Sequence, residues 1–301
     1  MTEESTAEPI RAKQSSRGTR DSSRVVIYLG YHKTASKWIW KNVFTERYPH
    51  QQINLVRQSA DSVWDAIEAS QGPFIVRQRL EEGLMGEEIP ELATTISHNF
   101  PNARIVLGIR SQHSMVASHY GQYVTNGGRM GLAAYLNKAV QTKWHYQRVL
   151  EPFFELFPER VHVYLFEDLR RNSFELLCHL RDFVGPPEGG LPDDEVRYIA
   201  NQPPMNPQRH DLVIDTMLTL NRLRMRHRKN TIFPEIRRRG HDHIFVELAE
   251  YLARKYSNRT GRPLRYRKFD DRGILAKVYG AENRALSAFL SRSLADDGYP
   301  S

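Results

Sequence analysis

A short run of small, polar and basic residues near the N-terminus has the composition of an anion-binding loop. It reads Tyr31-His-Lys-Thr-Ala-Ser-Lys-Trp38 and follows an apolar segment that ends at Gly30. At the start of a helix the backbone N–H groups point at an anion, and the helix dipole favours negative charge there. Lys33 adds a positive charge, and the hydroxyl groups of Thr34 and Ser36 add further donors. These residues therefore predict a site for a phosphate or a similar anion.

A second set of anion-binding groups follows a later apolar segment. Arg110 ends the segment 103–110, and Ser118 comes eight residues after it. An arginine fork and a hydroxyl group on one strand–helix unit can hold a phosphate together. Taken singly, Arg110 could pair with a surface carboxylate and Ser118 could simply pack within a helix. Together with the first loop, they predict a ligand that carries two separate anionic groups.

The elements that must position these loops can be read from the apolar pattern. Apolar, β-branched runs predict four buried strands, at 24–30, 73–77, 103–110 and 161–166. Helical spacing and capping residues predict helices that begin near 36 and that cover 90–100, 111–124, 131–157 (with Pro152 as its candidate break) and 174–184. The rest of the chain is helical in pattern. Strands that alternate with helices predict an α/β fold, in which a parallel sheet has helices on both faces and ligands bind beyond the carboxyl ends of the strands.

The composition bounds the organisation of the chain. Its 301 residues, 40% of them hydrophobic, suffice for one large domain over 24–301. Residues 1–23 are rich in Ser, Thr, Glu and Arg without an apolar stretch, and we expect a disordered lead-in there. Cys178 is the one cysteine, so an intrachain disulfide is impossible and a reducing, cytoplasmic location is expected. No apolar run reaches the length of a membrane span.

The formal net charge of +8 is concentrated in one part of the sequence. Residues 209–272 hold 17 Lys and Arg against 8 Asp and Glu, a net of +9, and the densest run is 222–239. Such a run can attract polyanions, although a solvated helix and loop would look the same. A nucleic-acid surface also needs aromatic rings on which bases stack, and Phe233 is the one aromatic residue in that run. We therefore do not expect nucleic acid as the partner.

The two anion motifs resemble those of sulfotransferases that use 3′-phosphoadenosine 5′-phosphosulfate (PAPS). In many members the 5′-phosphosulfate loop reads His-Lys-Thr-Gly/Ala-Thr/Ser-Thr-Trp, and Lys37 stands where the family more often has threonine or serine. The segment 100–110, followed by Ser118-His-Tyr120, is similar to the family's 3′-phosphate segment, with Ser111-Gln112 in place of the usual Asn-Pro. Residues 161–185 and 274–300 extend the resemblance.

The resemblance implies a P-loop NTPase-like sulfotransferase fold with a helical C-terminal part. Residues 186–273 match poorly, and this is the region that usually helps to shape the acceptor site and the nucleotide lid. Carried over position by position, the PAPS-binding residues are Lys33, Thr34, Ala35, Ser36, Lys37, Trp38, Arg110 and Ser118.

The activity that the resemblance implies is in-line transfer of a sulfuryl group from PAPS to a hydroxyl or amine of a small-molecule or glycan acceptor. Lys33 would stabilise the charge that develops on the leaving group, and no metal is required. A base must also take the acceptor's proton. Glu82 begins Glu82-Gly-Leu-Met-Gly86, which fits the Glu-x-Leu-x-Gly part of the family's base motif. Glu81 and His32 are the further candidates for the base, although a surface role for Glu82 and a loop-orienting role for His32 stay open.

One rival is a nucleotide kinase or triphosphatase with an atypical phosphate loop. Such enzymes use Gly-x-x-x-x-Gly-Lys-[Ser/Thr] and a Mg²⁺-binding aspartate after a strand. Gly30 lies three residues before Lys33 with no second glycine between them, and Asp168 stands where the sulfotransferase pattern has its aspartate. The other rival is a polyanion-binding protein that uses 222–239. The sequence decides neither the acceptor nor the oligomeric state.

Overall fold

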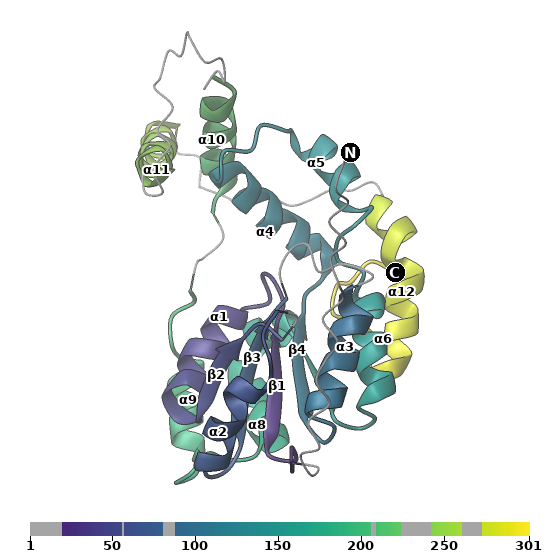
Figure 1. Ribbon diagram of the computed structural model, residues 1–301. Helices are drawn as coiled ribbons and strands as arrows, with labels where there is room; N and C mark the ends of the chain where they lie inside the picture. Colours follow the sequence, from purple (N-terminus) through teal and green to yellow (C-terminus); the bar gives the residue numbers. More distant parts are fainter. Residues whose placement is uncertain (1–19, 56, 81–87, 206–208, 224–241, 261–272) are drawn as a thin grey trace, which may run out of the picture.

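The computed structural model describes residues 20–55, 57–80, 88–205, 209–223, 242–260 and 273–301. A five-stranded parallel sheet with the order β2-β3-β1-β4-β5 lies at its centre (Figure 1). The strands are β1 (Val25–Gly30), β2 (His50–Ile53), β3 (Phe74–Arg79), β4 (Arg104–Ile109) and β5 (Val161–Leu165). The structure confirms the predicted α/β class and the four predicted strands, which are β1, β3, β4 and β5. Because all strands are parallel, their carboxyl ends lie along one edge of the sheet.

Strand β2 was not predicted from the sequence. Its four residues, His-Gln-Gln-Ile, contain no apolar run, and only the last of them is buried. It pairs with β3 at the edge of the sheet, where no other strand of the described residues lies on its far side. The residues of β2 can therefore be polar, because β2 is held by backbone hydrogen bonds to β3 and does not depend on burial of its side chains.

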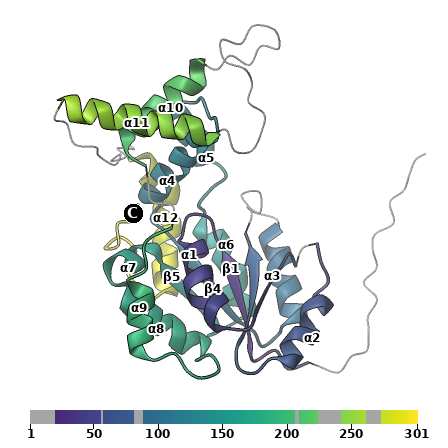
Figure 2. The same ribbon diagram turned by 90° about the vertical axis from the view of Figure 1, so that its left-hand side faces the viewer.

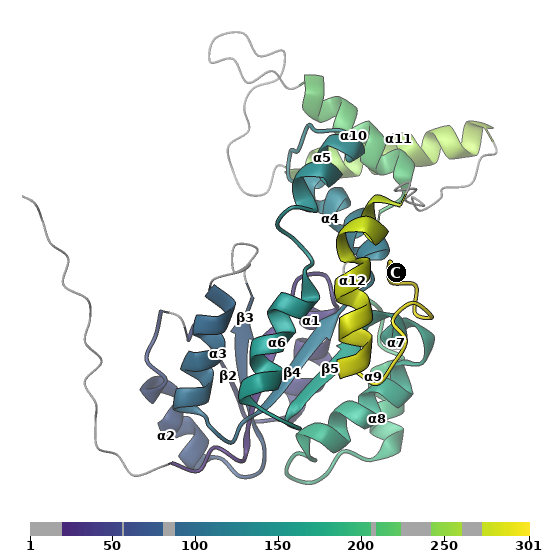
Figure 3. The same ribbon diagram turned by 90° about the vertical axis from the view of Figure 1, so that its right-hand side faces the viewer.

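Helices cover both faces of the sheet (Figure 3). A separate apolar core lies on each face. Alternate residues of β1 supply the two cores, with Val25, Ile27 and Leu29 in one and Val26 and Tyr28 in the other. Burial of a large aliphatic side chain contributes roughly 1.5–3 kcal/mol. The first face carries α2 (Asp61–Ala69), α3 (Glu88–Asn99), α4 (Gln112–Thr125), α6 (Tyr146–Leu156) and α12 (Ile274–Phe289). The second face carries α1 (Ser36–Ile39), its π-helical continuation η1 (Trp40–Thr45), α8 (Ser173–Val184) and α9 (Asp193–Ala200).

The long helix predicted over 131–157 is two helices. The chain forms α5 (Leu132–Ala139), turns, and then forms α6, which contains Pro152. The break comes instead at Trp144, whose backbone is left-handed with φ 65° and whose indole is almost fully buried. The sequence analysis placed the break at the proline because proline disfavours a helix interior. In the structure the chain turns at Trp144, where the indole packs into the core.

Residues 20–23, which the sequence analysis placed in a disordered lead-in, make specific contacts in the structure. The Oγ of Ser22 is buried and accepts a hydrogen bond from the Asn102 N–H at 2.8 Å. Arg20 lies over the Trp64 ring and pairs with Glu68 at 3.3 Å. Residues 20–23 are therefore fastened to α2 and to the turn before β4, and residues 1–19 lie outside the described part of the chain.

The predicted helical C-terminal part includes an arm of two helices that stands away from the sheet (Figures 1 and 2). Helix α10 (Asp211–Leu223) packs against α11 (Asp242–Thr260) and against the end of α4. Asn221 fastens α10 by donating from Nδ2 to the carbonyls of Val124, at 2.7 Å, and Gly128, at 3.0 Å. Across the described residues, each helix is too short or too polar to cross a membrane.

Candidate functional site

The loop between β1 and α1 has the backbone shape of an anion cradle. Lys33 and Ala35 both adopt the left-handed region with φ 62°, and Thr34 between them does not. Alternation of left- and right-handed residues turns successive N–H groups toward a common point, which is the geometry of an anion-binding nest. The N–H groups of Trp38 and Ile39 bond to the Ala35 carbonyl, so those of Ser36 and Lys37 precede the first internal bonds of the helix.

Two buried tyrosines hold this loop from beneath. Tyr28 on β1 donates to the Ser36 carbonyl at 3.2 Å, and Tyr164 on β5 donates to the Thr34 carbonyl at 3.1 Å. The two hydroxyl groups also lie 3.1 Å apart. Burial raises the pKa of Tyr164 to about 12, so its hydroxyl group remains a donor at neutral pH. The loop is thus fastened through its carbonyls, which leaves its N–H groups as the side that can receive an anion.

The predicted side chains of the loop differ in how they are placed. The Thr34 hydroxyl group is buried and donates to the Tyr31 carbonyl at 3.1 Å, so it stabilises the turn. Trp38 is buried and donates from Nε1 to the Pro203 carbonyl at 3.1 Å, which ties α1 to the segment after α9. Lys33 and Ala35 are half-buried, Ser36 is buried and Lys37 is exposed. Lys33 is therefore the lysine that lies closer to the interior of the loop.

Arg110 connects the second predicted anion site directly to the loop. It follows β4, the strand next to β1, and is 6% exposed. Its Nη1 donates to the Lys33 carbonyl at 3.1 Å, and its guanidinium group lies over the Phe166 ring at 4.1 Å. Burial lowers the pKa of Arg110 to about 10, with Glu167 acting in the opposite direction, so the group stays charged at neutral pH. The structure thus brings the two sites together at one edge of the sheet.

A serine that the sequence analysis did not single out lies beside this arginine. Ser114 accepts from Arg110 Nε at 2.8 Å, and its hydroxyl oxygen lies 3.1 Å from the Ser111 carbonyl and 3.3 Å from Glu167 Oε1, either of which can accept its hydrogen. Ser118, which was predicted, lies half-buried one helical turn further along α4 on the same face. The spacing of four residues between Arg110, Ser114 and Ser118 is the signal in the sequence that could have identified Ser114.

The C-terminal tail also reaches this site. Ser111 donates from Oγ to the Gly298 carbonyl at 2.6 Å, and Tyr299 donates to Glu167 Oε2 at 3.2 Å. Glu167, in α7 (Phe166–Arg171), also accepts from the Ser111 N–H at 3.1 Å. Burial raises the pKa of Glu167, and its hydrogen bonds and the Arg110 charge oppose that shift. The tail thus helps to hold the carboxylate beside Arg110, a contact across 132 positions of sequence that no local pattern reveals.

His32, in the loop, contacts a second histidine on α4. His32 Nδ1 and His119 Nε2 lie 2.9 Å apart. Burial, followed by the neighbouring His32, lowers the pKa of His119 to about 2. The rings of His119 and Trp144 pack edge to face, with ring centroids 5.4 Å apart. This pair is the second feature of the site that the sequence did not predict as a unit.

Several predicted residues cannot be placed. Glu81 and Glu82, the carboxylates proposed as the base, lie outside the described residues, as does most of the basic run 222–239. Asp168 pairs with Arg292 through both of its carboxylate oxygens and lies 3.5 Å from Arg171. Within the described parts of the chain, no group of three or more His, Cys, Asp or Glu side chains is arranged to hold a metal ion.

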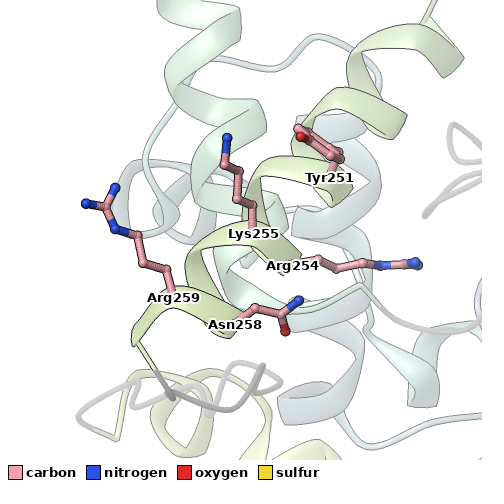
Figure 4. A pocket seen from close by; sticks show the side chains of 5 residues that line it. All are labelled: Tyr251, Arg254, Lys255, Asn258 and Arg259. Atoms are coloured by element: carbon pink, nitrogen blue, oxygen red, sulfur yellow. The ribbon is translucent and has the colours of Figure 1, made fainter.

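A hollow of about 600 Å³ lies on α11, away from the loop (Figure 4). All of its lining residues come from this one helix, and their side chains spread in different directions. They are Tyr251, Arg254, Lys255, Asn258 and Arg259. Because these groups do not converge on a common point, the hollow is not the candidate site.

Comparison with known proteins gives distant structural likenesses. No protein-family model and no curated protein matches the chain. Among solved structures, mouse sulfotransferase SULT7A1 complexed with PAP is similar at 12% identity over 81% of this chain and 87% of that chain, with a TM-score of 0.43. A sulfotransferase from Alicyclobacillus acidocaldarius is similar at 16% identity over 65% of this chain and 82% of that chain, with a TM-score of 0.36. Likenesses at this level do not identify a reaction, which has to be inferred from the site itself.

Proposed function

We propose that this protein transfers a sulfuryl group from PAPS to a hydroxyl or amine acceptor. The contact between Arg110 Nη1 and the Lys33 carbonyl carries the proposal, because it joins two anion-binding groups that follow the adjacent strands β1 and β4. A nucleotide with anionic groups at both its 5′ and 3′ positions matches such a double site. A nucleotide with a single phosphate group would occupy only one of the two anion sites.

Each residue of the double site has a role in this proposal. The N–H groups from Lys33 to Lys37 would bind the 5′-phosphosulfate, and the Lys33 ammonium group would neutralise it further. The Trp38 N–H bonds to the Ala35 carbonyl, so Trp38 would close the loop. Arg110 and Ser118 would bind the 3′-phosphate. The Thr34 hydroxyl group already bonds to the Tyr31 carbonyl, so Thr34 would contribute its N–H.

The transfer itself is a displacement at sulfur. The acceptor oxygen or nitrogen forms a bond to sulfur while the bond from sulfur to the bridging phosphate oxygen breaks. The electron pair stays on that oxygen, where Lys33 would stabilise it, and the acceptor's proton passes to a base. Glu82, Glu81 and His32 remain the candidates for that base. Positioning and charge stabilisation supply the catalysis, as in phosphoryl transfer.

The rival functions find less support among the described residues. A kinase or triphosphatase needs an aspartate after a strand to hold Mg²⁺, and Asp168 is instead paired with Arg292 and Arg171. A polyanion-binding role would draw on the run 222–239, most of which lies outside the described residues. The cytoplasmic location and the acceptor class, a small molecule or a glycan, stay predictions from the sequence.

Nucleotide binding tests the double site without knowledge of the acceptor. The desulfonated product, 3′-phosphoadenosine 5′-phosphate (PAP), should raise the melting temperature by mass action. Adenosine monophosphate, which lacks the 3′-phosphate, should raise it much less at the same concentration. Equal shifts for the two nucleotides would contradict the assignment.

The reaction is tested by incubating the full chain with PAPS and pools of acceptors. PAP release that depends on an acceptor, together with a sulfated product, would establish the activity and identify its substrate. Nucleoside triphosphates serve as the control donor in the same pools. Transfer from a triphosphate in the presence of Mg²⁺, with none from PAPS, would favour the kinase instead.

A further inference from the structure

We propose that His119 is a positioning residue that fixes the tautomer of His32, so that His32 Nε2 takes the acceptor's proton. This inference rests on the proposed sulfuryl transfer and selects one of the three candidate bases. It also gives a role to α4 that lies outside the two anion sites.

The contact is one hydrogen bond between two elements of the fold. His32 belongs to the loop after β1, whereas His119 lies on α4. Their nitrogens, Nδ1 and Nε2, are 2.9 Å apart, and the two rings are tilted by 53°. At this distance a single proton lies between the two nitrogens, so one ring donates and the other accepts.

The surroundings of His119 determine that it stays neutral. The side chain is 5% exposed and packs against Trp144. Among the described residues, the charged or titratable groups that act on it are His32 and Lys33 in the loop, Lys143 before α6 and Arg110 after β4. These groups are basic, and together with burial they lower the pKa of His119 to about 2. At neutral pH His119 therefore keeps one N–H group and one accepting nitrogen.

A neutral His119 can support proton transfer to His32 in one arrangement. A doubly protonated His32 carries hydrogens on both of its nitrogens, so its contact with His119 persists only if His119 Nε2 accepts. The same arrangement in the resting protein places the His32 proton on Nδ1, and the basic lone pair is then on Nε2. The pair thus needs no internal proton shift before the acceptor is deprotonated.

The transfer moves one proton from the acceptor to His32 and one sulfuryl group from PAPS to the acceptor. The acceptor's oxygen forms its bond to sulfur and releases its proton to His32 Nε2. The bond between sulfur and the bridging oxygen breaks, and its electron pair remains on the phosphate oxygen beside Lys33. The imidazolium of His32 stays hydrogen-bonded to His119 until it releases the proton to solvent.

Nitrogen-15 NMR of the full chain, labelled at histidine, tests the pairing without any turnover. In the wild type, His32 should show a protonated Nδ1 and an unprotonated Nε2, with and without PAP. His119→Phe preserves a ring against Trp144 but removes the acceptor, and His32 should lose this preference. His119→Gln offers an amide oxygen close to the position of Nε2, so His32 should keep its proton on Nδ1 in this variant. A wild-type His32 protonated on Nε2 would overturn the inference.

Kinetics with PAPS test whether the pair serves catalysis. His119→Phe should lower kcat by about a hundredfold, with PAP affinity unchanged, and His119→Gln should recover part of the loss. The acid limb of the kcat profile should also move to lower pH in His119→Phe, because protonated His32 has lost its acceptor. His113→Phe, on the same helix, is the matched control and should behave as the wild type.

The outcomes separate this inference from the proposed function. A wild type that neither binds PAP nor turns over PAPS would reject the function. An active wild type whose kcat survives His119→Phe but collapses in Glu82→Gln would reject the histidine pair and keep the function.

Discussion

The loop after β1 and the arm formed by α10 and α11 are built in opposite ways. Buried side chains from three different strands reach the loop, namely Tyr28 of β1, Arg110 after β4 and Tyr164 of β5. The outer surface of α11, in contrast, exposes Tyr251 at 60% and Tyr256 at 45%. The loop is thus part of the core of the protein, whereas much of α11 faces solvent.

The difference indicates which region can hold a reacting group in place. Lys33 and Ala35 adopt a left-handed backbone that costs roughly 1–2 kcal/mol for each residue other than glycine. Such a conformation persists only where the surroundings determine it, and the tyrosines and Arg110 provide those surroundings. The ion pairs on the arm, such as Arg254 with Glu250 at 4.0 Å, are exposed and each contributes about 0–1 kcal/mol. The loop, and not the arm, is therefore the region that can hold charged groups in a fixed arrangement.

The largest expected effect separates the two lysines of the loop. Lys33→Ala should lower PAPS turnover by roughly a hundredfold or more, because it removes charge where the leaving group develops it. Lys37→Thr, at an exposed position, should leave turnover largely intact. The measurement is kcat for both variants beside the wild type. Equal losses of kcat would show that the different burial of Lys33 and Lys37 does not give them different roles in turnover.

The buried side of the loop should also make stability depend on pH. His119 titrates near 6.5 when unfolded, and burial lowers its folded pKa to about 2, so the unfolded state binds more protons below pH 6.5. The free energy of unfolding should therefore fall as pH decreases, by about 1.4 kcal/mol per pH unit from this group. Denaturant titrations from pH 7.5 to 3 would measure the slope, and His119→Phe should reduce it.

A second buried histidine provides the control for that slope. Burial lowers the pKa of His162, on β5, to about 4. His162→Phe should therefore remove a contribution only between about pH 6.5 and 4, whereas His119→Phe removes one that continues below pH 4. If neither variant changed the slope, the acid sensitivity would have to arise elsewhere in the chain.

The third prediction concerns the arginine that joins the two anion sites. Arg110→Gln should weaken PAP binding about ten- to a hundredfold, the value of a lost charge-assisted hydrogen bond of about 1.5–3 kcal/mol. Binding of adenosine monophosphate should change much less. Titration calorimetry with both nucleotides measures the difference, and Arg170→Gln, an exposed arginine on α7, is the matched control. A parallel loss for both nucleotides would indicate that Arg110 acts on the loop and not on a 3′-phosphate.

A smaller effect tests the backbone of the loop. Ala35→Gly relieves a left-handed alanine and should raise the free energy of unfolding by about 0.5–1 kcal/mol. The same substitution at Ala281, exposed within α12, should lower it by about 1 kcal/mol because glycine weakens a helix. Opposite signs in the two variants would confirm that the loop conformation is imposed. A destabilising Ala35→Gly would refute this.

The smallest effects are expected on the arm. The double variant Arg254→Ala with Arg259→Ala removes exposed side chains and should change the free energy of unfolding by less than about 0.5 kcal/mol for each substitution. PAP affinity should remain at the wild-type value. A loss of PAP affinity would show that the arm contributes to nucleotide binding, and a loss restricted to turnover of a polymeric acceptor would assign it to the acceptor.

Much of the sheet could be predicted because buried strands carry their signal locally. The apolar runs at 24–30 and 103–110 identify β1 and β4. The candidate anion-binding residues follow these runs, so the runs also identify the edge of the sheet where those residues lie. The polar edge strand β2 and the turn at Trp144 escaped prediction, because hydrogen bonds to β3 hold the first and burial of the indole creates the second. Periodicity within a window of residues cannot detect either cause.

The candidate site divides along the same line. Residue types and spacing single out Lys33 and Arg110 as candidates, because a charged group at the end of an apolar strand is visible in the chain itself. The tertiary structure decides which groups surround them. Ser114 and Glu167 beside Arg110, and His119 against His32, come from other elements of the fold. Their contacts depend on how α4 and α7 pack against the sheet, and burial in that packing sets the protonation of His119.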